Sequence, residues 1–480
     1  MDQVFNARTL FKTVKDREKS GRLAREAVSR RELTRWEPAD PARDSLALLM
    51  SQESTRVQAL LPLRHYRMAQ SPFAFYRGSA ILMATDLAVN RPRSGLNVQL
   101  CGDAHLANFG LFAVHDRSIV FDVNDFDETH QGPFEWDVLR LVTSFVIGAQ
   151  SNGFTAKEAT TAAHHAARGY RRAIHRLSRL NPIEIFYERM DETRLKHWLV
   201  DIDGKDGARR LTRHLARAEK RDQWSAINKL TEVHNGIRQF QNIPPVLTRI
   251  THAEPVRDKL RDMFKAYRKT LPMAADHLLS RYDIVDIGHK VVGVGSVGLL
   301  AYVLLLQGRD ENDLLVLQAK EAVPSVLERY TQANPLRSEG LRVIHGQCLM
   351  QAAHDAFLGW IEAPLGRSFY VRQLRDKKWA PLIEEMKLEG LSIYAELCGE
   401  VLARCHARTG DCIAISSYLG KSEKFDHLAA EFGNHYAGQV ADDYQRFTTA
   451  IRQKHIIATD DLLGPEFITS AESGILVDNP

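Results

Sequence analysis

The chain has 480 residues, which is enough for two or three lobes that each bury a core of their own. Its hydrophobic content of 44% and charged content of 26% are typical of a globular protein and exclude a largely disordered chain. The formal net charge of +4 suits an anionic nucleotide but is too small to indicate a nucleic acid partner.

The cysteines and the apolar segments indicate the cellular compartment of the protein. The five cysteines include no pair with CxxC spacing, so neither a disulfide framework nor a zinc site is indicated. The N-terminus lacks a continuous apolar segment, and the longest apolar run, residues 297–306, is too short to cross a bilayer. We expect a reduced, cytoplasmic protein without a membrane partner.

The first half of the chain is mainly helical by pattern. Polar helices are expected over about the first 60 residues, with a turn at 38–41, and an apolar helix begins at Ser71. A strand is expected at 97–100 and a hairpin at 111–114 and 118–123. From Trp136, apolar residues recur at helical spacing, and mainly helical sequence continues to about Leu279.

The pattern changes at Ile284. Three strands are expected, around the glycine-rich segment 293–298, at 299–306 and at 314–320. A helix over 341–355, two short strands at 356–361 and 369–374, and a helix over 388–406 complete the series. The chain shows no internal repeat.

Two polar segments suggest phosphoryl transfer. Asp103 and Asn108 lie five positions apart in a loop after the strand 97–100, and Asp122, Asp125 and Asp127 accompany the return strand of the hairpin. Phosphotransferases use an aspartate at the acceptor hydroxyl, and an asparagine oxygen with a second carboxylate at magnesium. Alternatively, Asp103 and Asn108 cap turns, and the acidic residues form a solvated strand edge or a calcium site. The main metal ligand among the three aspartates stays open.

The glycine motif Gly293-x-Gly295-x-x-Gly298 fits two phosphate-binding devices. A dinucleotide-binding unit needs a helix after the third glycine, but residues 299–306 are too short and too uniformly apolar for one. In a kinase the glycines join two antiparallel strands, and a lysine on the third strand contacts the nucleotide. Lys320 lies at that place, and its expected ion-pair partner is Glu328, or else Glu339; the alternative is that Lys320 ends its strand in solvent.

Several segments resemble known families. Residues 101–108 (CGDAHLAN) resemble the HGDxHxxN catalytic loop of aminoglycoside phosphotransferases and related protein-kinase-like enzymes. Residues 124–127, with Trp136-Asp137 downstream, resemble their IDxxD strand and its later aspartate. The chain is also similar to a large bacterial family of unknown function that carries GDxHxxNFG, NDFDE, GPxEWD, VVGVGSVG and FYVRQLRD.

The resemblance implies a role for each matching residue. Asp103 would be the catalytic base or the acceptor-orienting carboxylate, and Asp137 would support the catalytic loop. Asn108 would be a metal ligand, Asp125 the principal Mg²⁺ ligand, and Asp127 a second ligand or its support. The ATP site would comprise Gly293, Val294, Gly295, Ser296, Val297 and Gly298 over the phosphates, Lys320 with Glu328 beside them, and Gln373 with Leu374 at the adenine.

Two departures from the kinase pattern matter. Cys101 stands where the catalytic loop usually has a histidine, so the support that this histidine provides must be absent or replaced. The glycines and Lys320 follow Asp103 instead of preceding it, which implies a circular permutation with the connection cut after the helix 388–406. Relocated termini on exposed surfaces leave the same contacts possible.

We therefore expect an α+β, protein-kinase-like two-lobed fold with permuted connectivity, a small β-rich lobe and a large helical lobe. Its parts would be a helical N-terminal extension (1–60), a helical lobe with the catalytic and metal-binding loops (61–280), a nucleotide-binding β-rich lobe (281–376) and a helical segment that completes the large lobe (377–480).

The predicted function is ATP- and Mg²⁺-dependent phosphoryl transfer to a hydroxyl acceptor, a small molecule, with a protein acceptor left open. One alternative is AMP transfer by the same site. Another is a pseudokinase that binds nucleotide or serves as a scaffold, for which Cys101 is the reason. A NAD-binding unit ranks third, and a strand after Gly298 would eliminate it.

Overall fold

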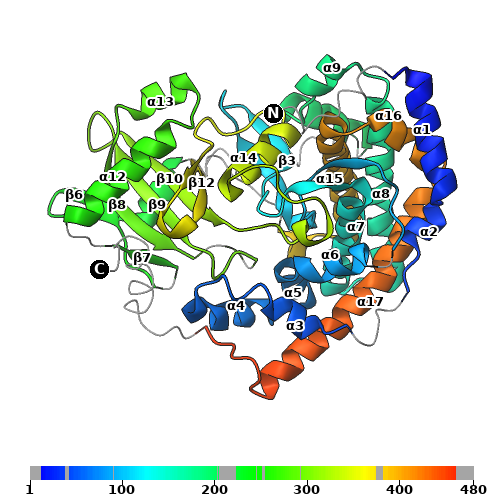
Figure 1. Ribbon diagram of the computed structural model, residues 1–480, viewed down its shortest axis with the longest axis horizontal. Coiled ribbons are helices and arrows are strands. Elements are labelled where there is room, and N and C mark those ends of the chain that lie inside the picture. The colour runs from blue at the N-terminus through cyan, green and yellow to red at the C-terminus, as the bar shows by residue number, and fades with distance from the viewer. Residues whose placement is uncertain are drawn as a thin grey trace.

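The computed structural model describes residues 12–37, 43–89, 91–202, 204, 223–244, 246–250, 254–291, 293, 295–374 and 382–460. Figure 1 shows one body built on a β-sheet, with α12 (Glu254–Arg268) and α13 (Met273–Leu279) beside it, and a second body of long helices. The helix α14 (Glu339–Met350) and the hairpin strand β3 (Ile119–Val123) lie between the two bodies. The chain is thus a mixed α/β protein, in agreement with the α+β class.

The main sheet has six strands in the order β11-β12-β10-β9-β8-β7, and all neighbours are antiparallel. The strands are β7 (Leu247–Arg249), β8 (Asp283–Lys290), β9 (Ala301–Gln307), β10 (Leu314–Ala322), β11 (Gly359–Glu362) and β12 (Ser368–Gln373). The glycine-rich segment joins β8 to its antiparallel neighbour β9. Since a strand and not a helix follows Gly298, the dinucleotide-binding alternative is wrong.

Three two-stranded sheets lie outside the main sheet, pairing β1 (Asn97–Leu100) with β4 (His130–Pro133), β2 (Phe109–Ala113) with β3, and β5 (Thr231–His234) with β6 (Ile237–Phe240). The strand at 97–100 and the hairpin that follows it confirm the sequence prediction. The strands β5, β6 and β7 interrupt the region that was expected to be mainly helical. Asn235 and Gly236 have φ of +50° and +79°, which are typical of the two-residue turn that the Asn-Gly pair favours.

Most of the remaining chain is helical. The helices before the main sheet are α1 (Val14–Ala27), α2 (Arg30–Thr34), α3 (Ser45–Met50), α4 (Leu61–Met68), α5 (Pro72–Gly78), α6 (Ala80–Ala88), α7 (Phe134–Ser151), α8 (Ala156–Leu177), α9 (Pro182–Tyr187) and α11 (Gln223–Leu230). The last three are α15 (Leu388–Thr409), α16 (Cys412–Leu419) and α17 (Lys424–Arg452). Within the described residues, no helix is both long enough and apolar enough to cross a membrane.

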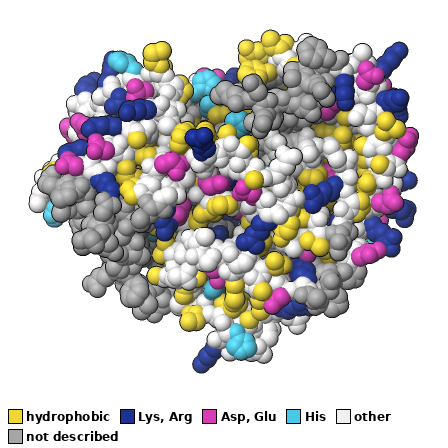
Figure 2. Space-filling view, in the orientation of Figure 1, with side chains coloured by type: hydrophobic (Ala, Val, Ile, Leu, Met, Phe, Trp, Pro, Cys, Tyr) yellow, Lys and Arg dark blue, Asp and Glu magenta, His cyan; other side chains and the backbone are white. Residues whose placement is uncertain are grey.

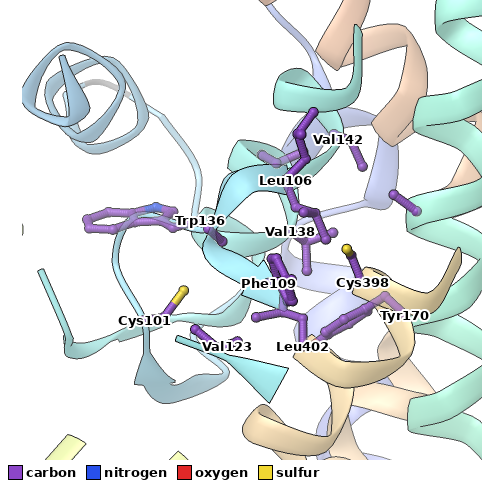
Figure 3. Close-up of a cluster of buried hydrophobic side chains, with 14 of the residues drawn as sticks. Cys101, Leu106, Phe109, Val123, Trp136, Val138, Val142, Tyr170, Cys398 and Leu402 are labelled. Carbon is purple, nitrogen blue, oxygen red and sulfur yellow. The ribbon is translucent and has the colours of Figure 1, made fainter. Parts of the chain in front are cut away.

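The core of the helical body forms around α7. Nearly every side chain of this helix is buried, as expected of a helix that is covered on all sides. Figure 3 shows Val138 and Val142 of α7 close to Phe109 and Leu106, which come from the start of β2 and the turn before it. The hairpin and the loop before it are therefore anchored on α7 by apolar packing.

Helices α8 and α15 approach each other through small residues. A Cβ atom added to Gly399 would overlap the carbonyl oxygen of Ala166, and one added to Gly169 would overlap the carbonyl oxygen of Glu396. Only glycine allows this backbone approach on either side. Many of the buried side chains of α8 are alanines, such as Ala162, and their small size allows a neighbouring helix to lie close to α8.

We predict that Gly399→Ala lowers the free energy of unfolding by about 1–3 kcal/mol, because the added methyl group meets backbone atoms that cannot move aside. Gly390→Ala is the matched control, since it lies in the same helix and its added methyl group would meet no atom within 4 Å. This control should raise stability by about 0.5–1 kcal/mol. Urea denaturation of the two variants checks the prediction, and equal effects would contradict the close helix approach.

Candidate active site

A cavity of about 540 Å³ lies where the sequence motifs meet. Its walls come from the glycine-rich segment, the residues after Lys320, the loop after β1 and the acidic segment after β3. The predicted site residues that line it are Asp103, Asn108, Asp125, Asp127, Gly293, Gly295, Ser296 and Glu328. Its volume is within the range of small-molecule sites. Segments almost two hundred residues apart in sequence thus share one cavity.

Lys320 meets the acidic segment in a buried ion pair. Its ammonium group donates to Asp127 Oδ2 and lies 4.0 Å from Asp125 Oδ2. Ser296 Oγ donates to the same Asp127 oxygen at 3.2 Å, and the Tyr370 hydroxyl donates to the other at 2.8 Å. Burial opposes ionisation of both partners, but their attraction lowers the pKa of Asp127 and raises that of Lys320. The lysine therefore remains a cation behind Asp127 and Asp125, and it does not itself line the cavity.

The prediction that Glu328 pairs with Lys320 is wrong, and so is the second choice, Glu339. Glu328 Oε1 accepts the backbone N–H of Asn334 at 2.8 Å, and Glu339 pairs with Arg342 at 2.5 Å. The sequence prediction chose a glutamate that lies close to Lys320 along the chain. In the folded chain the acidic segment lies beside the sheet, so Asp127 is nearer to Lys320 than either glutamate.

Asn108 and Asp125 offer the oxygens best suited to a magnesium ion. Asn108 donates its amide N–H to the carbonyl of Asp103 at 2.8 Å, so its Oδ1 is not used in that bond. Asp125 uses one oxygen to accept the N–H of Asp127 at 3.2 Å. Both line the cavity, and oxygen ligands are what Mg²⁺ requires. Asp127, predicted as a further ligand, already accepts three hydrogen bonds from Lys320, Ser296 and Tyr370.

Asp122 does not share the face of Asp125 and Asp127. Its Oδ1 lies 3.7 Å from Cys405 Sγ on α15, where the thiol donates to it, and it also accepts the N–H of Val123 at 2.8 Å. Burial raises the pKa of Asp122 to about 6. The strand ends at Val123 and the chain turns, so Asp122 faces α15 while Asp125 and Asp127 line the cavity.

Asp103 is held by an arginine that the sequence analysis missed. Arg140 Nε donates to Asp103 Oδ1 at 2.5 Å, and its guanidinium lies over the Tyr76 ring, 4.2 Å from the centroid. Burial raises the pKa of Asp103, whereas Arg140 and then Arg77 act to lower it. The sequence did contain a signal for Arg140: it lies three positions after Asp137, which places both residues on one face of the helix.

The catalytic-type loop is fixed from behind by Asp137. This buried carboxylate accepts the backbone N–H of Cys101 at 2.8 Å and that of Gly102 at 3.1 Å. His406 Nε2 donates to the same carboxylate at 3.2 Å, and its Nδ1 accepts from the Tyr170 hydroxyl at 2.9 Å. The support that Cys101 cannot supply thus comes from the end of α15, more than three hundred residues later.

Arginines before α5 hold the glycine-rich segment, another feature that the sequence analysis missed. Arg56 donates to the carbonyl of Val297 at 2.8 Å, Arg64 to that of Gly295 at 2.6 Å, and Arg67 to that of Gly293 at 2.7 Å. The glycines allow this approach, since a Cβ on Gly298 would lie 3.0 Å from the Cβ of Arg56. The carbonyls of the segment are therefore directed toward the N-terminal helices.

The remaining predicted nucleotide residues lie elsewhere. The N–H of Gln373 donates to Asp355 at 2.5 Å and that of Leu374 to the carbonyl of Val316 at 2.9 Å, and neither residue lines the cavity. Leu374 packs in an apolar cluster with Phe240, so the predicted adenine contact has no support in the geometry. Val297 packs with residues of α4, such as Leu63. Val294 falls outside the described residues.

A family model matches residues 56–450, which is well over half of the chain. Its description is an uncharacterized protein conserved in bacteria, DUF2252. The chain belongs to this family. Searches of curated proteins and of solved structures returned no match. The DUF2252 span includes the cavity and loop-supporting residues described above, from Arg56 to His406, whereas Ser51, Gln52 and Thr55, which also line the cavity, lie just before it.

We predict that Asp122→Asn stabilises the protein increasingly as the pH rises from about 4 to about 6. The pKa of Asp122 is about 6 in the folded chain, against an ordinary value of 3.8, so its ionisation in this window opposes folding. Asparagine cannot ionise, and every other group titrates alike in both proteins. Urea denaturation at several pH values measures the difference in unfolding free energy, and a constant difference would contradict burial of the Asp122 carboxylate.

We predict that His406→Leu destabilises the protein by about 1–3 kcal/mol, because the hydroxyl of Tyr170 and an oxygen of Asp137 each lose a buried partner. Tyr170→Phe removes the hydroxyl, so the double variant should cost less than the sum of the two single variants. Urea denaturation of all four proteins completes the cycle. Additive effects would show that the two side chains do not act through this hydrogen-bond chain.

Proposed function

We propose that this protein is an ATP- and magnesium-dependent phosphotransferase of the protein-kinase-like type, with its chain permuted, and that it acts on a hydroxyl acceptor. One observation carries the proposal. Lys320 lies on β10, the strand that follows the β8–β9 hairpin. Its ammonium group pairs with Asp127 and lies 4.0 Å from Asp125. Ser296 of the glycine-rich segment donates to the same Asp127. A glycine turn and an acidic pair that line one cavity, with a lysine directly behind that pair, are the parts that phosphoryl transfer needs.

The junction of α15 with β1 supports the permutation. Thr409 Oγ1, at the end of α15, accepts the backbone N–H of Gln99 at 3.1 Å, and a Cβ on Gly410 would overlap the Val98 side chain. The end of this helix therefore lies against the strand that leads into the loop of Asp103. In an unpermuted kinase-like chain, a helix leads into that loop, and the observed adjacency keeps this contact although the chain order differs.

The residues of the cavity suit an in-line transfer. When bound, Mg-ATP would supply the phosphoryl group and the charge-neutralising cation. Asn108 and Asp125 would hold the cation by their oxygens. Lys320 would contact the phosphates, and the glycine-rich segment would cover them. Asp103, kept in place by Arg140, would accept a hydrogen bond from the acceptor hydroxyl and orient it toward the phosphorus atom.

His406 favours an enzyme over a nucleotide-binding scaffold. The argument for a pseudokinase was Cys101, which cannot support the loop as a histidine would. His406 and Asp137 supply that support from another direction. AMP transfer by the same cavity remains an outcome of the acceptor assay, where AMP instead of phosphate would appear on the product.

We predict that the protein binds ATP only when magnesium is present, and that Asp125→Asn and Lys320→Met each weaken binding by roughly tenfold or more, a loss of about 1.4 kcal/mol. Asp122→Asn is the matched control, because this nearby carboxylate faces α15, and it should leave the affinity unchanged. Isothermal titration calorimetry measures the affinities, and circular dichroism checks folding. Absence of nucleotide binding by the unaltered chain would overturn the proposal.

A further inference from the structure

Arg77 is a cationic residue that lines the cavity but has no role in the phosphoryl transfer proposed above. It lies in the last turn of α5 and lines the cavity together with Asp103 and Asp125. Its Nε has no hydrogen-bond partner among the described residues although the atom is buried. Its guanidinium carbon lies 6.0 Å from the centroid of the Phe73 ring. The Arg77 side chain is only partly buried, but its enclosed Nε lacks a hydrogen-bond acceptor, so this geometry is suited to a ligand that supplies one.

Three carboxylates of the cavity are paired with cations other than Arg77. Asp103 pairs with Arg140, and Asp127 pairs with Lys320. Glu321 pairs with Arg367 at 2.5 Å. Arg140 makes the direct ion pair with Asp103, whereas Arg77 acts on that carboxylate only at a distance.

The position of Arg77 is fixed by the same arginine that holds the glycine-rich segment. Arg64 donates to the carbonyl of Gly78, next to Arg77, at 2.7 Å and to that of Gly295 at 2.6 Å. A Cβ on Gly295 would lie 3.1 Å from the carbonyl oxygen of Arg77, so the two backbones are close. Binding at Arg77 would therefore occur in a wall that is already ordered, which limits the entropic cost.

His105 provides a second polar atom beside Arg77 and Asp103. Its Nδ1 is buried without a hydrogen-bond partner among the described residues, and its Nε2 lies 3.7 Å from Asp103 Oδ2. Its ring meets the Phe73 ring edge to face, with centroids 6.1 Å apart. An imidazole carries at least one N–H, which can donate a hydrogen bond to an anion.

We propose that Arg77, assisted by His105, binds an anionic group of the acceptor, a carboxylate or a phosphate, and so selects hydroxylated anions as substrates. The inference rests on the proposed function, since it takes Asp103 as the residue at the acceptor hydroxyl. Lys320 and the glycine-rich segment lie on the sheet side of the cavity, where the nucleotide phosphates would bind. Arg77 and His105 lie with Asp103 in the helical body, on the acceptor side.

The test uses the full chain, with inorganic phosphate and acetate as probes of the anionic group. Calorimetry measures the affinity of each probe after saturation of the protein with Mg²⁺ and the non-hydrolysable analogue β,γ-imido-ATP. We expect at least one probe to bind beside the nucleotide, and Arg77→Gln to weaken that probe by roughly tenfold or more, as expected for a charge-assisted contact. The affinity for the nucleotide analogue should stay within about twofold.

Two further variants control the measurement. Arg77→Lys keeps the charge but loses the fork of donors, so it should retain part of the affinity. Arg22→Gln, on the exposed face of α1, removes the same charge at a distance and should change nothing. Circular dichroism and thermal melting of each variant show whether the fold is preserved.

The other possible outcomes show whether Arg77 binds the acceptor anion, the nucleotide phosphates or neither. If Arg77→Gln weakens the nucleotide analogue and the probes displace that analogue, Arg77 belongs to the nucleotide phosphates and the acceptor proposal is wrong. If neither probe binds, or if both bind equally to Arg77→Gln, the proposal is also wrong while nucleotide binding stands. If the probes bind through Arg77 but ATP does not bind, the anion site stands and the proposed function fails.

Discussion

The buried ion pair between Lys320 and Asp127 is the interaction on which the candidate site depends. It joins the main sheet to the acidic segment that follows the hairpin of the helical body. Removing two charges from water is expensive, and the cost is offset only when the remaining hydrogen-bonding capacity is satisfied. Ser296 and Tyr370 complete the shell of Asp127, so the glycine-rich segment and β12 are fixed by the same carboxylate. This contact therefore joins three of the segments that surround the cavity.

Asp137 plays the corresponding part on the helical side. It stands at the first turn of the buried helix α7, receives two backbone N–H groups of the loop that carries Asp103, and is held by His406. The loop therefore depends on three helices, α7, α8 and α15, that come from distant parts of the chain. Because these contacts are between packed elements, they do not depend on the order in which the chain visits them, and the proposed permutation leaves them intact.

The charged groups of the cavity differ in whether they have partners within the protein. The carboxylates mostly have partners within the protein, whereas Arg77 presents donors without a hydrogen-bonded acceptor. Figure 2 shows side chains of both charge signs on the face of the molecule between the sheet body and the helical body. Arg77 is therefore suited to an anionic ligand, while Asp125 stays available to a cation. The proposed anionic acceptor and the proposed Mg-nucleotide use these two groups.

Local patterns in the sequence determined much of this protein. Alternation and glycine turns located β1, the β2–β3 hairpin and the strands on either side of the glycine-rich segment, because these depend on residues close in sequence. The same patterns selected Asp103, Asn108 and Asp125, all of which line the cavity. The Asn235-Gly236 hairpin was also readable, but its turn signal was overlooked in a region of helical spacing.

Only the tertiary structure decided the partners. Lys320 pairs with a carboxylate almost two hundred residues away, because the acidic segment folds under the sheet, while the nearer Glu328 turns to its own loop. His406 supports the loop of Asp103 through Asp137, and Arg64 holds the glycine-rich segment, by equally distant contacts. Periodicity along the chain reports which face of an element is buried, but it carries no information about which distant charge will meet that face. That choice is made by the packing of whole elements, where a buried charge must find its partner.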